Sequence, residues 1–217
     1  MSPYHTILFD LDGTLTDPKV GITKSVQYAL ARFGVEEKNL DLLEPFIGPP
    51  LADSFKAFYQ LNDMQAQEAI AYYREYFQDQ GLYENEVYPH IPDLLTGLID
   101  AQKQLILSTS KPTVFARKIL EHFGLNDFFM DIAGATLDQT RTTKPEIIQF
   151  IFSTHPELDR ETTVMVGDRK HDIEGARHHN LDAIAVTYGY GSIQELQRAR
   201  PTHRVDTVEE LKTLLLT

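Results

Sequence analysis

From residue 104 to the end of the chain, short apolar runs alternate with segments whose apolar residues recur at helical spacing. The apolar runs predict β-strands, and the segments between them predict α-helices. The predicted strands cover residues 104–108, 131–135, 163–166 and 183–186, and the predicted helices cover residues 113–123, 145–154, 172–179 and 208–216. Strands that alternate with helices form parallel βαβ units. We therefore expect an α/β fold with a doubly wound, Rossmann-like parallel sheet.

The chain begins with a further strand and then departs from this alternation. Residues 7–9 are an apolar run that predicts a short buried strand. Between residues 17 and 87 no strand pattern is visible, and apolar residues recur at helical spacing in two stretches, one stopped by Gly34 and the other covering residues 64–78. We expect a Rossmann-like core formed by residues 1–16 and 88–217, and an inserted all-helical cap formed by residues 17–87 that could act as a lid. The alternative is a helical layer packed on the sheet.

The composition excludes several classes of protein and of site. The chain of 217 residues is long enough for one domain with an insert, and it has no cysteine, which excludes disulfides and thiolate sites. A net charge of −12 argues against binding to nucleic acids or anionic membranes, since both require a basic face. No stretch predicts a membrane span, and the first strand begins close to Met1, so we expect a cytoplasmic protein. We expect a monomer because no heptad pattern is sustained.

Two acidic residues follow the first predicted strand at the point where it ends. Asp10 and Asp12 come directly after residues 7–9, and Gly13 and Thr14 predict a turn behind them. Open α/β sheets bind ligands at the carboxyl ends of their strands. Two carboxylates at such a place are costly unless a cation compensates their charge. The pattern therefore predicts a metal ion, and a metal ion beside a carboxylate suggests phosphate chemistry.

Three more polar segments lie where strands of the same sheet are expected to end. Residues 108–111 are three hydroxyl residues and a lysine after an apolar run, Lys144 stands against the start of a predicted helix, and Asp168 and Asp172 follow the strand at 163–166. Each segment has an ordinary explanation by itself, as a turn, a helix cap or a solvated charge. Their joint order favours one shared functional site over four separate ordinary features.

These four segments, in this order, resemble the motifs of the haloacid-dehalogenase-like hydrolase superfamily, and the chain is most similar to its phosphoglycolate-phosphatase-like branch. The resemblance covers essentially the whole chain. It implies a nucleophile at Asp10, a general acid/base at Asp12 and a catalytic lysine at Lys144. The residues implied to contact the phosphate group are Gly13, Thr109, Ser110 and Lys144. Ser110 stands where many relatives carry asparagine, which leaves substrate selection open.

The resemblance also implies a bound Mg²⁺ ion. Its ligands would be the carboxylates of Asp10 and Asp168 and the main-chain carbonyl of Asp12, with Asp172 supporting the ion through a water molecule or from behind these ligands. The implied activity is Mg²⁺-dependent hydrolysis of a small phosphomonoester through an aspartyl-phosphate on Asp10. Phosphoglycolate, nucleotides, sugar phosphates and phosphotyrosine are all compatible with the motifs. Two alternatives are a phosphomutase of the same fold and a regulatory binding protein without catalysis.

Overall fold

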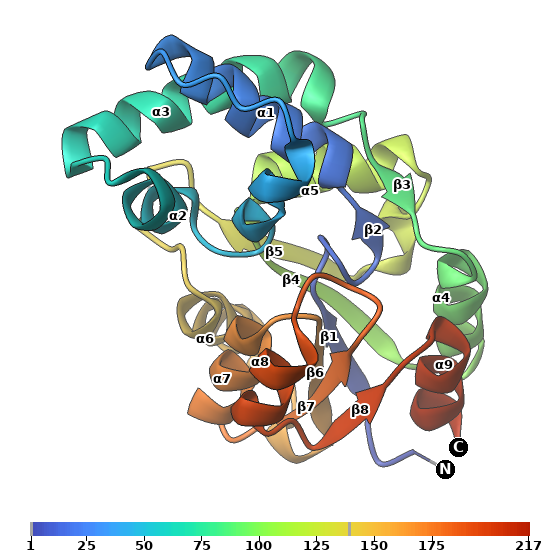
Figure 1. Ribbon diagram of the computed structural model, residues 1–217. Helices are drawn as coiled ribbons and strands as arrows, with labels where there is room; N and C mark the ends of the chain where they lie inside the picture. The colour runs from blue at the N-terminus through green and yellow to red at the C-terminus, as the bar shows by residue number, and fades with distance from the viewer. Residues whose placement is uncertain (1, 139) are drawn as a thin grey trace. The chain divides into compact units, whose positions relative to one another are not determined.

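The computed structural model describes residues 2–138 and 140–217. The chain forms two compact units, one made of the residues up to Asp17 together with Val87–Thr217, and the other made of Pro18–Glu86. The first unit contains a six-stranded parallel sheet with the strand order β5-β4-β1-β6-β7-β8 (Figure 1). Its strands are β1 (Thr6–Phe9), β4 (Gln104–Pro112), β5 (Asp131–Ala135), β6 (Thr163–Gly167), β7 (Asp182–Val186) and β8 (His203–Val205). A separate two-stranded sheet consists of β2 (Thr16–Asp17) and β3 (Glu86–Val87).

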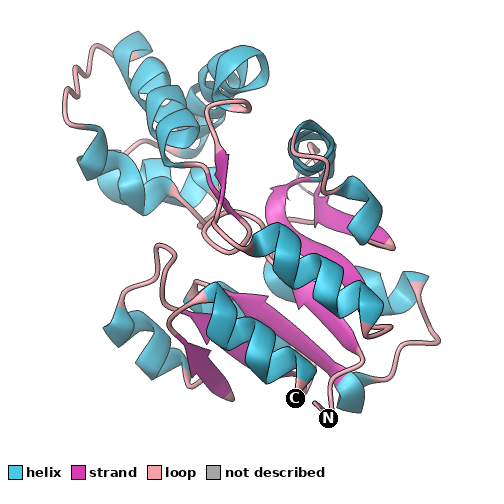
Figure 2. Ribbon diagram, turned by 90° about the vertical axis from the view of Figure 1, so that its right-hand side faces the viewer, coloured by secondary structure: helices cyan, strands magenta, loops and turns pink. Residues whose placement is uncertain are grey.

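Helices lie on both sides of the large sheet, as Figure 2 shows. They are α4 (Ile91–Asp100), α5 (Thr113–His122), α6 (Lys144–Thr154), α7 (Lys170–His178), α8 (Ile193–Ala199) and α9 (Val208–Leu216), with short 3₁₀ turns η3 (Asn126–Phe128) and η4 (Arg160–Thr162). The helices α6, α7 and α8 share one apolar core with the strands, which includes Leu8, Met165 and Ile147. This is the doubly wound α/β architecture expected from the alternation of strands and helices. Among the described residues, no helix has the length and apolar character needed to cross a membrane.

The strand register brings the ends of three strands to one edge of the large sheet. Phe9, the last residue of β1, lies opposite Leu107 of β4 and Val166 of β6. Asp10 follows Phe9 directly, and its amide donates to the carbonyl oxygen of Val166 at 2.9 Å. Because the three strands are parallel, the residues that follow them lie side by side at the carboxyl edge. The polar segments seen in the sequence are therefore neighbours in the fold.

The predicted strands and helices of this unit are confirmed in type, and some of them differ in extent. Strand β4 runs to Pro112 because a register shift against β5 lets it continue past residue 109. Helix α7 begins at Lys170, two residues earlier than predicted, since the carboxylate of Asp172 accepts the amide of Arg169 and so caps the first turn. Strand β8 was not predicted, because only one of its three side chains is apolar and buried.

The second unit is helical up to Glu86, where β3 begins. Its helices are α1 (Lys19–Arg32), α2 (Leu51–Tyr59) and α3 (Asp63–Tyr76), with a 3₁₀ helix η1 (Leu40–Phe46) and a π-helix η2 (Phe77–Gly81). Aromatic rings fill its interior: Phe46 lies edge-on to Phe55 at 5.0 Å between centroids, and Tyr73 stacks on Phe77 at 5.3 Å. The fold is thus an α/β core with an inserted helical cap.

Candidate active site

The loop after β1 is a tight turn that holds the first two acidic residues. The carbonyl oxygen of Leu11 accepts the amides of the residues at 14, 15 and 16, and the amide of Gly13 donates to the carbonyl oxygen of Thr16 at 2.8 Å. Gly13 has φ of 82°, and a Cβ there would lie closer than 3.0 Å to the carboxylate of Asp168, so only glycine suits this position. Since the Gly13 amide is engaged, the loop amides without an acceptor among the described residues are those of Leu11 and Asp12.

Lys144 is the first residue of α6, and its side chain is buried at the end of β1. Its ammonium group donates to the carbonyl oxygen of Ser108 at 2.6 Å and lies 2.8 Å from Asp10 Oδ1 and 2.6 Å from Asp172 Oδ1. Burial by itself lowers the pKa of Lys144, but the charges of Asp10 and Asp172 outweigh that effect and raise the pKa. The lysine therefore stays charged and joins the ends of β1 and β4 to the first turn of α7.

Asp10, Asp168 and Asp172 form a buried acidic cluster. Each can place one carboxylate oxygen within 4.8 Å of the others. Burial, and then the charges of Asp172 and Asp10, raise the pKa of Asp168 well above its ordinary value. Burial also raises the pKa of Asp172 to about 6, against the opposing effect of Lys144. Three carboxylates beside one lysine carry an excess of negative charge that a cation would compensate.

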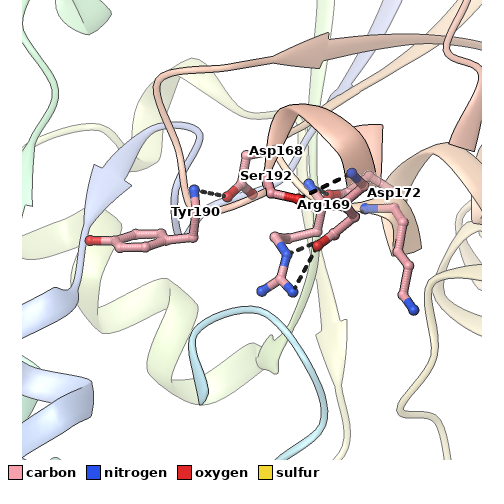
Figure 3. A network of polar contacts seen from close by, with 7 residues as sticks. Asp168, Arg169, Asp172, Tyr190 and Ser192 are labelled. Carbon is pink, nitrogen blue, oxygen red and sulfur yellow. Dashed lines mark hydrogen bonds and ion pairs between the residues drawn. The ribbon is translucent and has the colours of Figure 1, made fainter. Parts of the chain in front are cut away.

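The carboxylate of Asp168 is oriented by the loop that follows β7. The amide of Tyr190 donates to Asp168 Oδ2 at 2.7 Å (Figure 3), while Oδ1 has no hydrogen-bond partner among the described residues. Glycine makes this approach possible, because a Cβ at Gly189 or Gly191 would lie closer than 3.0 Å to atoms of Asp168. In the sequence, the two glycines on either side of Tyr190 indicate such a close approach of the backbone.

Asp12 is held by a residue to which the sequence analysis gave no role of its own. The ammonium group of Lys111 lies 2.8 Å from Asp12 Oδ2, and both side chains are buried. The second oxygen, Asp12 Oδ1, is buried without a hydrogen-bond partner among the described residues. Burial raises the pKa of Asp12, although Lys111 acts in the opposite direction. The sequence signal that could have assigned Lys111 to the site is its position directly after the hydroxyl residues at the end of β4.

The hydroxyl residues at the end of β4 differ in how they are engaged. Thr109 is buried, and its Oγ1 accepts the amide of Lys111 at 3.2 Å, so its own hydrogen is available to a ligand. The carbonyl oxygen of Ser108 accepts a hydrogen bond from the ammonium group of Lys144. Ser110 is half-buried and makes no side-chain hydrogen bond within the part of the chain that the structure describes. The structure thus brings together Lys144 and the acidic cluster, joins Asp12 and Thr109 through Lys111, and leaves Ser110 unattached.

Comparison with known proteins agrees with this arrangement. The family model for haloacid dehalogenase-like hydrolases matches residues 7–186. A 5′-nucleotidase of Pseudomonas aeruginosa is 47% identical over 212 residues, which cover 98% of this chain and 96% of the relative. The tyrosine-protein kinase PtkA of Mycobacterium tuberculosis is 36% identical over 96% of this chain and 72% of its own length. The crystal structure of a predicted phosphatase from Clostridium acetobutylicum superimposes with a TM-score of 0.95 at 44% identity, covering 98% of both chains. The chain belongs to the haloacid dehalogenase-like hydrolase family.

Proposed function

We propose that this hydrolase is a Mg²⁺-dependent phosphatase that cleaves a small phosphomonoester through an aspartyl-phosphate on Asp10. Its enzyme class is phosphoric monoester hydrolase, in agreement with its relatives. One observation carries the proposal: the Asp10 carboxylate is held by Lys144 within the acidic cluster, and Asp12 follows two residues later on the same tight turn.

The residues of the acidic cluster fit a magnesium ion. Asp168 Oδ1 is buried and lacks a hydrogen-bond partner among the described residues, although a buried carboxylate oxygen normally has one. Carboxylate and carbonyl oxygens are the ligands that Mg²⁺ prefers, and we propose that Asp10, Asp168 and the main-chain carbonyl of Asp12 hold the ion, with Asp172 behind them. When bound, the ion would offset the charge between the carboxylate and the phosphoryl group and help to align them.

The side chains around Asp10 can then carry out phosphoryl transfer in two steps. An oxygen of Asp10 attacks phosphorus while the bond to the leaving oxygen breaks, and Asp12 gives that oxygen a proton. A water molecule then attacks the phosphorus of the aspartyl-phosphate while the bond from phosphorus to the Asp10 oxygen breaks. Asp12 takes up the water's proton, the Asp10 carboxylate is restored, and inorganic phosphate leaves. Lys144 binds the charge of the phosphoryl oxygens, and the Thr109 hydroxyl and the loop amides of residues 11 and 12 donate to them.

The relatives suggest where to look for the substrate. We propose a nucleoside 5′-monophosphate as the first substrate class to test, since the relative that is 47% identical is named a 5′-nucleotidase. Phosphoglycolate, sugar phosphates and phosphotyrosine come next. Because the relative from Mycobacterium tuberculosis is named a kinase, the assay should follow phosphoryl transfer to other acceptors as well as release of phosphate.

The test measures inorganic phosphate released from these four classes of ester, with Mg²⁺ or with EDTA. Asp10→Asn keeps the size of the side chain and removes the nucleophilic carboxylate, so turnover should fall to background. Asp100→Asn, at the exposed end of α4, makes the same change of charge and should keep full activity. Mg²⁺ should also raise the unfolding temperature of the wild type, and Asp168→Asn should remove that shift.

Each alternative has its own result. Metal-dependent release that persists in Asp10→Asn would exclude Asp10 as the nucleophile. Little phosphate release, together with isomerisation of a sugar phosphate that requires a sugar bisphosphate, would favour the phosphomutase. Stabilisation by Mg²⁺ without hydrolysis or transfer would favour the regulatory binding protein.

A further inference from the structure

Strand β4 has an irregularity at its carboxyl end, directly beside the active site. Thr109 lies opposite Gly134 of β5, but the next paired residues are Pro112 and Ala135, so β4 advances three residues while β5 advances one. Bulges of this kind re-aim side chains and are common next to active sites. A Cβ at Gly134 would lie closer than 3.0 Å to the carbonyl oxygen of Lys111, so the bulge depends on glycine in the neighbouring strand.

Lys111 sits in this bulge and contacts two residues of the site. Its ammonium group lies 2.8 Å from Asp12 Oδ2, and its backbone amide donates to Thr109 Oγ1 at 3.2 Å. The side chains of Lys111 and Asp12 are only 5% and 11% exposed. A pair so little exposed is not a solvated surface pair, because loss of either partner would leave the other charge buried and uncompensated.

The ion pair uses one oxygen of Asp12 and leaves the other unoccupied. Oδ2 faces Lys111, whereas Oδ1 is buried with no hydrogen-bond partner among the described residues. A carboxyl group that delivers a proton must present one defined oxygen to the leaving group. The ammonium group of Lys111 therefore distinguishes the two oxygens of Asp12, because it engages Oδ2 and not Oδ1.

We propose that Lys111 is the positioning residue of the general acid: it holds Asp12 Oδ2, so that Oδ1 delivers the proton to the leaving oxygen. This inference rests on the proposed phosphatase function. In the first step the bond from Asp10 to phosphorus forms, the bond from phosphorus to the leaving oxygen breaks, and the proton on Asp12 Oδ1 passes to that oxygen. Lys111 touches neither bond and acts through Asp12 alone.

This role predicts a dependence on the leaving group that a structural role would not produce. An alkoxide is a poor leaving group and needs a proton as it departs, whereas p-nitrophenolate departs without one. A variant with a misplaced acid should therefore lose activity on an alkyl phosphate and keep it on p-nitrophenyl phosphate. Loss of folding, of metal binding or of phosphate binding should reduce both activities alike.

The experiment compares kcat/KM for the alkyl phosphate that the substrate panel ranks first with kcat/KM for p-nitrophenyl phosphate. This parameter reports the first transfer step, in which Asp12 acts as the acid. In Lys111→Met the alkyl-to-nitrophenyl ratio should fall by about tenfold or more, by analogy with partners that orient metal-binding side chains, whose loss typically costs about 10–100-fold. Asp12→Asn should show the same selectivity more strongly, and Lys111→Arg should restore part of the ratio.

Lys118→Met is the matched control, because it removes a lysine from the exposed side of the next helix, α5, and should leave the ratio unchanged. An equal loss on both esters in a folded Lys111→Met variant would overturn the positioning role while the phosphatase function stands. A wild type that hydrolyses neither ester would overturn the proposed function, and this inference with it. If Lys111→Met does not unfold cooperatively, Gly134→Ala, which displaces the bulge and keeps the lysine, should lower the same ratio; an unchanged ratio there would overturn the proposal.

Discussion

Lys144→Met keeps an unbranched side chain of similar length but removes the cation between Asp10 and Asp172. One carboxylate oxygen from each residue of the acidic cluster lies within 4.8 Å of the others. Two unit charges at that separation repel by about 3.5 kcal/mol at an effective dielectric constant of about 20. The buried carbonyl oxygen of Ser108 also loses its donor. Removal of one partner from a buried ion pair costs about 3–5 kcal/mol. We therefore expect the metal-free variant to lose stability in this range.

The assay is urea unfolding at neutral pH, in EDTA and in excess Mg²⁺, with Lys170→Met as the control. Lys170 is likewise the first residue of a helix but is exposed, so its replacement should change the free energy of unfolding by less than about 1 kcal/mol. Mg²⁺ should reduce the deficit of Lys144→Met, because an ion bound to the cluster would compensate the same carboxylates. A deficit in EDTA no larger than that of the control would refute the electrostatic reasoning. A large loss of unfolding free energy that Mg²⁺ leaves unchanged would show that Lys144 stabilises the protein independently of the proposed metal site.

Two further predictions concern single turns of the core and of the cap. Two backbone amides donate to the carboxylate of Glu146 and lower its pKa. The ionised carboxylate should therefore stabilise the fold at pH values above the ordinary pKa of glutamate. This stabilisation should be lost as the pH falls through the lower pKa of the folded state. Glu146→Gln should therefore cost about 0.5–1 kcal/mol at neutral pH and almost nothing in acid, and urea unfolding that gives the same cost at both pH values would contradict the assignment. Gly13→Ala should cost about 2–4 kcal/mol, because left-handed strain adds to the overlap with Asp168. Gly34→Ala, with φ of 74° and nothing within 4 Å of its Cβ, should cost about 1–2 kcal/mol from strain alone, and equal losses in the two variants would show that the close approach at Asp168 has no energetic effect.

Most of the fold was predictable because its signals are local. The apolar run at residues 7–9 and the later alternation of strands and helices depend on side-chain periodicity within a few residues. Parallel strands carry ligand sites at their carboxyl ends, and this rule places Asp10, Asp168 and Lys144 at one edge of the sheet from the sequence alone. Strand β8 was not predicted from the sequence, because its pairing with β7, and not its own composition, makes it a strand. The roles assigned to these site residues stay predictions until the assays are done.

What the sequence by itself determined, then, is the α/β class, the order of the motifs and the kind of groups that gather at the edge of the sheet. Only the tertiary structure decided how those groups pair: Lys144 with Asp10 and Asp172, Lys111 with Asp12, and the amide of Tyr190 with Asp168. The reason is physical. Each pair joins segments that are far apart in the chain, so no local pattern of residue types specifies it. The pairs of Lys111 and Tyr190 depend in addition on a bulge or on glycines that let two backbones approach.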